Sequence, residues 1–326
     1  MGAKYYLSFL YEKCIKILRG NSIQSYRHDV EAIFCDVFGC SWSELQIALM
    51  NNRGARITDE KSEQILACID RRVQHQPLQY ILQKAEFMGH TFRVDGGVFI
   101  PRPETETLVR LACSYIAERI KGVHNAAYAS TDMHRDTNAP VVVYDLCAGS
   151  GAIGISVQKE FGNKVQVTLV EKSGIALEFA NLNCLNLFSD SEIRPKCSKD
   201  DALTFNNFPE RPDLILSNPP YVPPRNLPPE LSFEPKSALY GGGKRGLHFI
   251  ANLVPHAFSL LQLGGAFIIE HDEKQGDGVQ EIFESAGFTG VVGYKDLNDR
   301  SRFVFGVKWH TDLPNSSIPP APTFSH

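Results

Sequence analysis

Apolar residues recur at helical spacing over residues 7–18 and again over residues 26–38, which predicts two amphipathic helices at the start of the chain. Ser41 and Glu44 have the spacing of a capping box, in which a hydroxyl and a carboxylate satisfy free backbone amides at a helix start. Thr58 is predicted to cap a fourth helix. The chain is therefore expected to open with a small helical bundle.

The bundle is expected to span residues 1–75, where it either packs against the rest of the protein or recognises a substrate. Residues 76–105 carry a β-like pattern around several glycines, which predicts a β-hairpin linker. Residues 106–310 are expected to form a second, larger domain. A polar stretch at residues 121–140 is a predicted surface insertion, and the Pro- and Ser-rich residues 311–326 form a predicted disordered tail.

Strand-like and helix-like patterns alternate in the larger domain. The predicted strands are residues 141–144, 165–170, 213–217 and 266–270, and helical stretches begin at Ala152, Gly174 and Gly246. This alternation predicts an α/β fold, with a mostly parallel sheet covered by helices on both faces. Ligands of such sheets bind at the carboxyl ends of the strands.

The composition narrows the classes of function. The 43% apolar and 21% charged residues are ordinary for a globular protein. The net charge of −4, with scattered Lys and Arg, argues against nucleic acid as a stable partner. Eight cysteines without a C-x-x-C pair predict reduced thiols and no metal site. No uncharged stretch has membrane-spanning length, so we expect a cytoplasmic protein without a membrane partner; the oligomeric state is left open.

A glycine-rich segment follows the first predicted strand of this domain directly. Gly149, Gly151 and Gly154 form a G-x-G-x-x-G pattern, which lets the backbone turn sharply and approach a ligand at a helix start. Glu171, at the end of the next strand, is placed to accept hydrogen bonds from both ribose hydroxyls of a nucleoside. These residues alone fit NAD and S-adenosylmethionine equally. Asp145 favours S-adenosylmethionine, because an acidic residue suits a cationic aminoacyl end better than a pyrophosphate.

Asn218, Pro219, Pro220 and Tyr221 follow the predicted strand at residues 213–217. Prolines lack amide donors, so the Pro219 carbonyl is free to face a ligand. This carbonyl and the Asn218 side-chain oxygen can accept both hydrogens of a planar NH2 group. Such a group is an amide or an exocyclic base amine, and Tyr221 is placed to stack on it or wall it in.

An amide nitrogen is a poor nucleophile, so catalysis of its methylation is expected to depend on positioning and on acceptors that stabilise positive charge growing on nitrogen. The alternatives are a ligand-free strand-to-helix turn at Gly149 and an ordinary proline turn at Pro219. The occurrence of both motifs in one domain favours a functional site.

With these motifs the chain resembles the HemK/PrmC family of protein-(glutamine-N5) methyltransferases. The matching stretches run from Gln76 to about Phe305, and they include residues 76–80, 99–106 (Phe-Ile-Pro-Arg-Pro-Glu-Thr-Glu), 218–221 and 233–235. The family pairs a helical amino-terminal domain with a seven-stranded methyltransferase domain. The resemblance therefore implies this fold.

The resemblance also implies roles for single residues. The cofactor would be S-adenosylmethionine, wrapped by Cys147, Ala148, Gly149, Ser150 and Gly151, with Glu171 at its ribose and Asp200 or Asp201 at its adenine. Asn218, Pro219, Pro220 and Tyr221 would hold the substrate glutamine. That substrate would be the Gly-Gly-Gln tripeptide of a peptide chain release factor.

Two other functions are compatible with parts of the pattern. A nucleic-acid methyltransferase could present the same acceptor pair to an exocyclic amine of adenine or guanine, and a scaffold could keep the cofactor site without catalysis. The acidic net charge disfavours the first and the intact Asn218 disfavours the second. The proline-rich loop at residues 222–231 either closes over a substrate or is a stiff surface loop. His271, Asp272 and Glu273 are interpreted as a turn after a strand.

Overall fold

The computed structural model describes residues 5–51, 56–121, 139–206, 209–309 and 321–322. The chain divides into two compact units. The first comprises Met1–Lys84 together with Leu227–Phe233, and the second comprises Ala85–Asn226 together with Glu234–His326. The chain therefore passes between the units three times, and a short segment that follows the Asn-Pro-Pro-Tyr motif belongs to the first unit.

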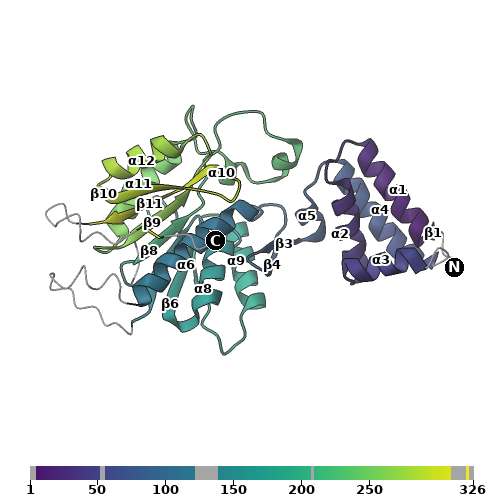
Figure 1. Ribbon diagram of the computed structural model, residues 1–326, viewed down its shortest axis with the longest axis horizontal. Coiled ribbons are helices and arrows are strands. Elements are labelled where there is room, and N and C mark those ends of the chain that lie inside the picture. Colours follow the sequence, from purple (N-terminus) through teal and green to yellow (C-terminus); the bar gives the residue numbers. More distant parts are fainter. Residues whose placement is uncertain (1–4, 52–55, 122–138, 207–208, 310–320, 323–326) are drawn as a thin grey trace. The chain divides into compact units, whose positions relative to one another are not determined.

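The first unit is built from helices, which Figure 1 shows packed against one another. They are α1 (Leu7–Gly20), α2 (Tyr26–Phe38), α3 (Trp42–Asn51), α4 (Asp59–Val73) and α5 (Leu78–Leu82), joined by the short antiparallel strands β1 (Tyr5–Tyr6) and β2 (Arg56–Ile57) and by the 3-10 helix η3 (Pro229–Phe233). Its core is apolar and includes Leu10, Cys14, Phe34, Ile65 and Ile69. The four predicted helices are thus present.

The predicted helix caps are confirmed. The Glu44 amide donates to the Ser41 hydroxyl at 3.3 Å, and the Ser41 amide donates to the Glu44 carboxylate at 2.8 Å. The Thr58 hydroxyl accepts from the Lys61 amide at 3.3 Å. Because these residues satisfy amides that helices leave unpaired, the local sequence fixes where α3 and α4 begin.

Ion pairs of Arg72 join α4 to α2 and to η3 within the first unit. The Arg72 guanidinium lies 2.7 Å from the Asp29 carboxylate, and both side chains are almost completely buried. Glu230 of η3 lies 3.6 Å from Arg72 and 3.4 Å from His75. Asp29 compensates the charge of the buried Arg72 guanidinium. The contact of Arg72 with Glu230 then holds η3 against α4.

The second unit begins with the predicted hairpin, formed by β3 (Lys84–Phe87) and β4 (His90–Arg93). Its main sheet has the order β10-β11-β9-β8-β5-β6-β7. The strands are β5 (Val141–Leu146), β6 (Val165–Val170), β7 (Lys196–Ser198), β8 (Leu214–Ser217), β9 (Ala266–Glu270), β10 (Phe288–Lys295) and β11 (Ser301–Lys308). Strand β11 pairs antiparallel with β9 and β10, whereas β5 pairs parallel with β6 and β8.

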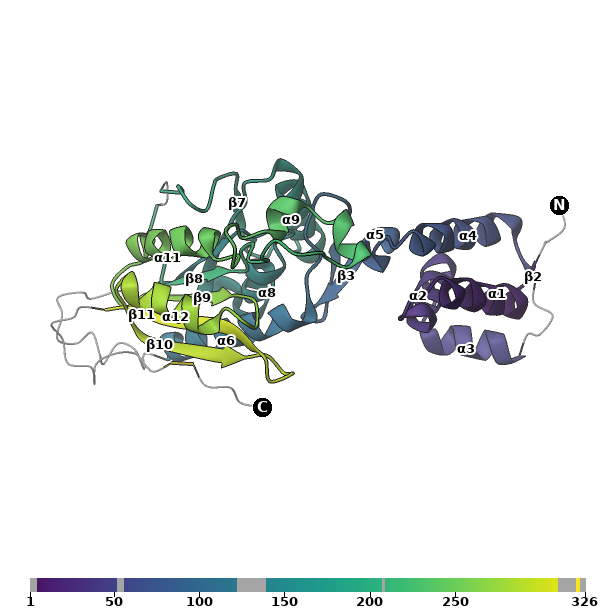
Figure 2. The same cartoon turned by 90° about the horizontal axis from the view of Figure 1, so that it is seen from above.

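Helices cover both faces of the sheet because alternate strand residues point to opposite sides. Val143, Leu214 and Ile268 pack with α6 (Glu106–Ile120), α8 (Ala152–Phe161) and α9 (Gly174–Leu187). Tyr144 and Ile215 pack on the other face with α11 (His248–Leu260) and α12 (Gly276–Ser285). Figures 1 and 2 show the strands between these two groups. The α/β fold with a seven-stranded sheet is confirmed.

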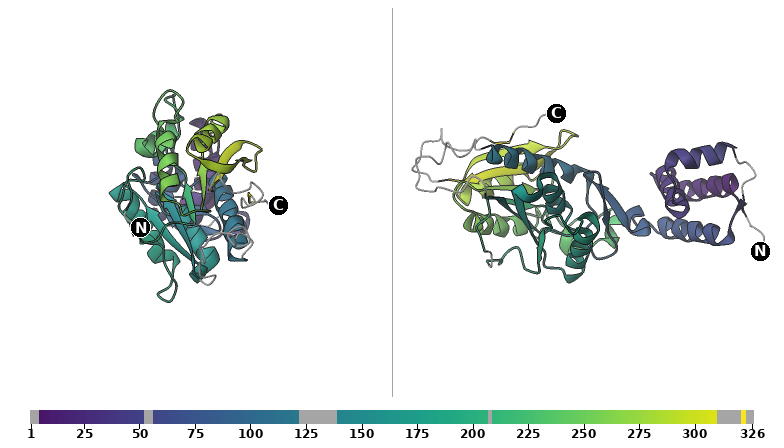
Figure 3. Two further views of the ribbon diagram at one scale, coloured as in Figure 1. Left: turned by 90° about the vertical axis from the view of Figure 1, so that its left-hand side faces the viewer. Right: turned by 90° about the horizontal axis from the view of Figure 1, so that it is seen from below.

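Shorter elements complete the second unit, namely the 3-10 helices η1 (Pro103–Thr105) and η2 (Gly162–Lys164) and the helix α10 (Lys236–Leu239). The views in Figure 3 show the elements of each unit from two further sides. Most of the predicted insertion at residues 121–140 and most of the predicted tail at residues 311–326 lie outside the described residues.

Within the described ranges, no single helix is long and apolar enough to cross a membrane. Helices α2 and α3 reach the length and composition of a span only as a pair, which is bent by 92°.

Candidate active site

A cavity of about 420 Å³ lies at the carboxyl ends of β5, β6 and β8. These three strands run parallel, so the residues that follow them meet at one edge of the sheet. The residues that line the cavity include Cys147, Ala148, Gly149, Ser150, Glu171, Asp201, Asn218 and Pro220. Most of the predicted site residues are therefore brought together. A volume of this size suits a ligand as large as a nucleoside with a side chain.

The glycine loop turns through left-handed backbone angles. Gly149 has φ 58°, Gly151 has φ 81° and the non-glycine Cys147 has φ 63°. A Cβ at Gly149 would meet no atom within 4 Å, whereas a Cβ at Gly154 would lie 2.3 Å from Leu169. The first glycine thus keeps the backbone open beside the cavity, and Gly154 lets α8 pack closely on β6.

Glu171 is held by backbone amides at the cavity wall. Its carboxylate accepts from the Gly149 amide at 2.9 Å and from the Ser173 amide at 2.7 Å. These bonds orient both oxygens before any ligand binds, and each oxygen keeps a further lone pair. The arrangement fits the predicted acceptance of ribose hydroxyls.

The two aspartates after β7 have different surroundings. Asp201 lines the cavity, and its carboxylate lies 2.7 Å from the Lys172 ammonium, which lowers the pKa of Asp201. Asp200 accepts a hydrogen bond from the Ser198 hydroxyl and is not part of the lining. Of the two alternatives, Asp201 is the one that lines the cavity.

Asp145 is placed differently from the expectation. It is fully buried and lies outside the cavity lining, where it accepts from the Gly154 amide at 2.9 Å at the start of α8. Its second carboxylate oxygen has no hydrogen-bond partner among the described residues. Burial is the main cause that raises the pKa of Asp145 to about 7. Contact between Asp145 and a cofactor stays a prediction.

Asn218 ends a chain of buried polar groups. Its side-chain nitrogen donates to the Thr105 hydroxyl at 3.2 Å, and Thr105 donates to the Glu270 carboxylate at 2.7 Å. The Tyr221 hydroxyl donates to the other Glu270 oxygen at 2.9 Å. Tyr221 and Pro219 are absent from the cavity lining, whereas Pro220 belongs to it. The structure thus directs the Tyr221 hydroxyl to Glu270, and its predicted stacking on substrate remains untested.

The backbone of the Asn-Pro-Pro-Tyr motif is fixed by a neighbouring strand-like segment. The Val222 amide donates to the Leu239 carbonyl at 2.8 Å, and the Gly241 amide donates to the Val222 carbonyl at 3.1 Å. A Cβ at Gly241 would lie 2.7 Å from the Pro220 carbonyl oxygen. Only glycine permits this approach, so Gly241 supports the motif although no sequence pattern marks it.

Several lining residues were not predicted as site residues, and those outside the stretches at residues 99–106 and 233–235 have no mark in their local pattern. The residues not predicted include Phe87, Phe99, Pro101, Thr105, Lys172, Leu203, Pro235, Ala238 and Phe249. Asn183 of α9 was missed as well, although its side chain donates to the Ser150 carbonyl at 2.9 Å and accepts from the Arg93 amide at 2.7 Å. The string at residues 99–106 was the available signal for Thr105.

The turn interpretation of residues 271–273 agrees with the structure. The Asp272 amide donates to the Gln275 side chain at 2.9 Å, and the Lys274 amide donates to the Asp272 carboxylate. In the part of the chain that the structure describes, no group of three or more His, Cys, Asp or Glu is arranged to hold a metal ion.

The charged residues of the cavity lining are compatible with S-adenosylmethionine. Glu171 and Asp201 are the acidic lining residues, and the ammonium of Lys172 is paired with Asp201. These carboxylates would attract the cationic centres of S-adenosylmethionine, and Glu171 can also accept hydrogen bonds from ribose hydroxyls. The lining therefore fits S-adenosylmethionine.

Comparisons with known proteins agree with this geometry. Residues 10–82 match the family model described as the PrmC N-terminal domain, and residues 132–234 match the methyltransferase small domain. A release factor glutamine methyltransferase of Bifidobacterium longum is 32% identical over 89% of this chain and 95% of its own length. A release factor glutamine methyltransferase of Clostridium acetobutylicum is 30% identical over 91% of this chain and 96% of its own length. Both relatives extend over the helical unit and the catalytic unit.

Among solved structures, a ribosomal protein L11 methylase from Lactobacillus delbrueckii subsp. bulgaricus is 18% identical, with a TM-score of 0.43 over 67% of this chain and 86% of that chain. So distant a likeness has no bearing on function.

The sheet, the cavity and the family matches together define an S-adenosylmethionine-dependent methyltransferase. More narrowly, the chain belongs to the release factor glutamine methyltransferase family, because its identity to members of that family extends over nearly its whole length.

Proposed function

We propose that this enzyme methylates the side-chain amide nitrogen of the glutamine in the Gly-Gly-Gln tripeptide of a peptide chain release factor. The observation that carries the proposal is the position of Asn218 at the cavity that Glu171 also lines. The names of relatives that align over nine tenths of the chain support the substrate. Bound S-adenosylmethionine would supply an activated methyl group there.

The residues of this chain would bind and orient the amide. The Asn218 side-chain oxygen and the Pro219 carbonyl are proposed to accept its two hydrogens, which turns the nitrogen toward the cofactor site and stabilises positive charge growing on it. Glu171 would hold the ribose, and the segment from Cys147 to Gly151 would surround the aminoacyl part. Asp201 is the proposed partner of adenine because it lines the cavity.

The walls of the cavity would exclude water from the reacting groups. Phe99, Pro101 and Pro235 line the same cavity as Asn218 and add apolar surface to its wall. Backbone pairing at Val222 and Gly241 keeps the motif rigid. Rigid acceptors lose little energy to reorganisation when charge develops, so this rigidity serves catalysis.

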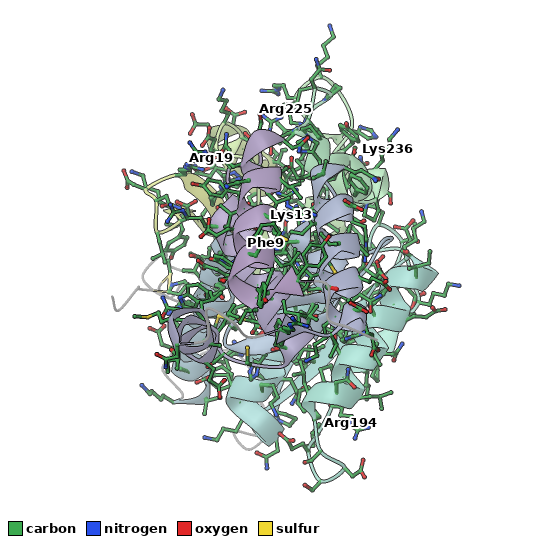
Figure 4. All side chains as sticks on the ribbon, turned by 90° about the vertical axis from the view of Figure 1, so that its right-hand side faces the viewer. Phe9, Lys13, Arg19, Arg194, Arg225 and Lys236 are labelled. Atoms are coloured by element: carbon green, nitrogen blue, oxygen red, sulfur yellow. The ribbon has the colours of Figure 1, made fainter. Side chains whose placement is uncertain are left out.

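The helical unit is proposed to recognise the release factor outside the tripeptide. Phe9 is 60% exposed on α1, and Figure 4 shows it with Lys13 and Arg19 on the same helix. Ile47 and Met50 of α3 are also exposed. Such apolar and basic side chains are suited to a protein surface. Because its proposed substrate acts in translation termination, we propose that the enzyme works in the cytoplasm, with the release factor as its partner in place of a nucleic acid or a membrane.

The test is to compare a purified release factor with its Gln→Ala variant as methyl acceptors, by mass spectrometry of the tripeptide region. We expect one added methyl group on the wild-type glutamine and none on the variant. Equal labelling of the two, or labelling of tRNA or DNA in their place, would reject the proposed substrate and favour a nucleic-acid amine.

A further inference from the structure

We infer that Thr105 and Glu270 are positioning residues for Asn218, fixing its side-chain amide with the nitrogen toward Thr105 and the oxygen free to accept from a substrate. This inference rests on the proposed function, because it explains how the acceptor needed for an amide substrate is oriented. The two residues come from η1 and from the end of β9.

The single hydroxyl proton of Thr105 fixes the direction of the hydrogen bonds on either side of it. A carboxylate only accepts, so the single hydroxyl proton of Thr105 is used in the 2.7 Å bond to Glu270. Thr105 can then meet Asn218 only as an acceptor. Of the two ends of the Asn218 amide, only the nitrogen donates, which fixes the amide orientation with the nitrogen at Thr105.

Thr105 and Glu270 are buried, which disfavours other arrangements of this hydrogen-bond network. Thr105 is 3% exposed and Glu270 is 2% exposed. A buried hydroxyl without its partner is costly, so the alternatives in which Thr105 or Glu270 loses a bond are disfavoured. Tyr221 satisfies the remaining Glu270 oxygen at 2.9 Å. The hydrogen bonds of this network therefore all point toward Glu270, from Asn218 through Thr105 on one side and from Tyr221 on the other.

The charge of Glu270 affects how strongly the Asn218 oxygen accepts a hydrogen bond. An ionised Glu270 polarises the Thr105 hydroxyl, and donation by the Asn218 nitrogen in turn strengthens its oxygen as an acceptor. If Glu270 were protonated toward Thr105, the threonine proton could turn to Asn218 and the amide would present its nitrogen to the substrate. The ionised carboxylate thus decides whether Asn218 offers an acceptor or a donor.

Several groups around Glu270 affect its ionisation. Burial raises the pKa of Glu270, the bonds from Thr105 and Tyr221 lower it, Arg302 of β11 also lowers it, and Glu104 raises it. Turnover is therefore expected to fall on the acid side as Glu270 gains a proton. Glu270→Gln cannot ionise at this position, so we expect its pH profile to lack that acid limb.

The experiment compares Thr105→Val, which removes the hydroxyl at similar shape, with Thr105→Ser, which retains it. Thr107→Val is the matched control, since Thr107 is a buried threonine of α6 outside the cavity lining. We expect Thr105→Val to lose roughly tenfold or more in kcat on release factor, as for an unsatisfied buried partner. Cofactor Kd should stay within about twofold, and Thr105→Ser should restore most of the turnover.

A second readout uses the free protein and needs no substrate. Exchange of the Asn218 side-chain NH2 protons with water, followed by NMR and assigned with Asn218→Ala, should be slower in the wild type and Thr105→Ser than in Thr105→Val. Equal exchange in all three, or wild-type kcat in Thr105→Val, would overturn the inference. A wild type that leaves release factor unmethylated rejects the proposed function instead, and the exchange measurement still decides the inference.

Discussion

The side-chain nitrogen of Asn218 donates a hydrogen bond of 3.2 Å to the hydroxyl of Thr105, which precedes it by 113 residues. Thr105 belongs to the string at residues 99–106 and Asn218 begins the Asn-Pro-Pro-Tyr motif. Two of the stretches that carry the family resemblance therefore meet at one amide group. Their contact gives the string at residues 99–106 a role at the site itself, in addition to starting α6.

Asn218→Ala should reduce kcat roughly a hundredfold or more, because an acceptor that strengthens in the transition state is lost. Cofactor affinity should change little. Asn252→Ala is the matched control, since Asn252 is an exposed asparagine of α11 whose side chain donates to the His248 carbonyl of the same helix. Steady-state kinetics with release factor and calorimetry with S-adenosylmethionine separate the two effects. An Ala variant with full turnover would remove Asn218 from the mechanism.

Glu171→Ala should weaken S-adenosylmethionine binding by about 1–3 kcal/mol, the range for polar groups left without partners. Part of the loss should come from the Gly149 and Ser173 amides, which Glu171 holds in the cofactor-free protein. Calorimetry on the wild type, Glu171→Ala and the exposed control Glu178→Ala measures it. Binding of NAD with no binding of S-adenosylmethionine would contradict the cofactor assignment.

Stability of the cofactor-free protein should depend on Asp145. Burial raises the pKa of Asp145 to about 7 from its ordinary value of 3.8. The folded protein therefore holds this proton where the unfolded chain releases it, and the associated stability is lost as pH rises from about 4 to about 7. Asp145→Asn cannot ionise, so relative to it the wild type should lose about 1.4 kcal/mol per pH unit in this window.

Urea unfolding of the wild type and Asp145→Asn at several pH values between 4 and 8 tests this linkage. A difference between the two proteins that stays constant with pH would show that Asp145 is ionised throughout. Repeating the series with saturating S-adenosylmethionine tests the predicted electrostatic contact, because a nearby cation would lower the pKa of Asp145.

Removal of residues 1–75 should leave cofactor binding and impair methylation of intact release factor, because the residues that line the cavity all lie in the second unit. The deletion also takes away Arg72 and His75, the partners of Glu230. Glu230→Gln therefore serves as a control that weakens this anchor and keeps the recognition surface. Normal methylation of whole substrate by the truncated enzyme would exclude a recognition role for the helical unit.

The sequence by itself determined the local elements of this protein. The amphipathic helices, their caps at Ser41 and Thr58, and the four predicted strands follow from periodicity and from short-range hydrogen bonds. The positions of the glycine loop and of the Asn-Pro-Pro-Tyr motif at one edge follow from parallel strand order. Each of these features depends on residues close in sequence or on a rule of parallel sheets, so a linear pattern is sufficient to predict it.

The tertiary structure alone decided which side chains face the cavity and which are buried behind it. Asp201 lines the cavity and Asp200 does not, although they are adjacent, and Asp145 is enclosed although its motif suggests a ligand contact. The bond from Thr105 to Glu270 spans 165 residues. Such outcomes depend on rotamers and on partners that arrive from distant strands, because a buried polar group takes whichever partner the packed fold brings within hydrogen-bonding distance.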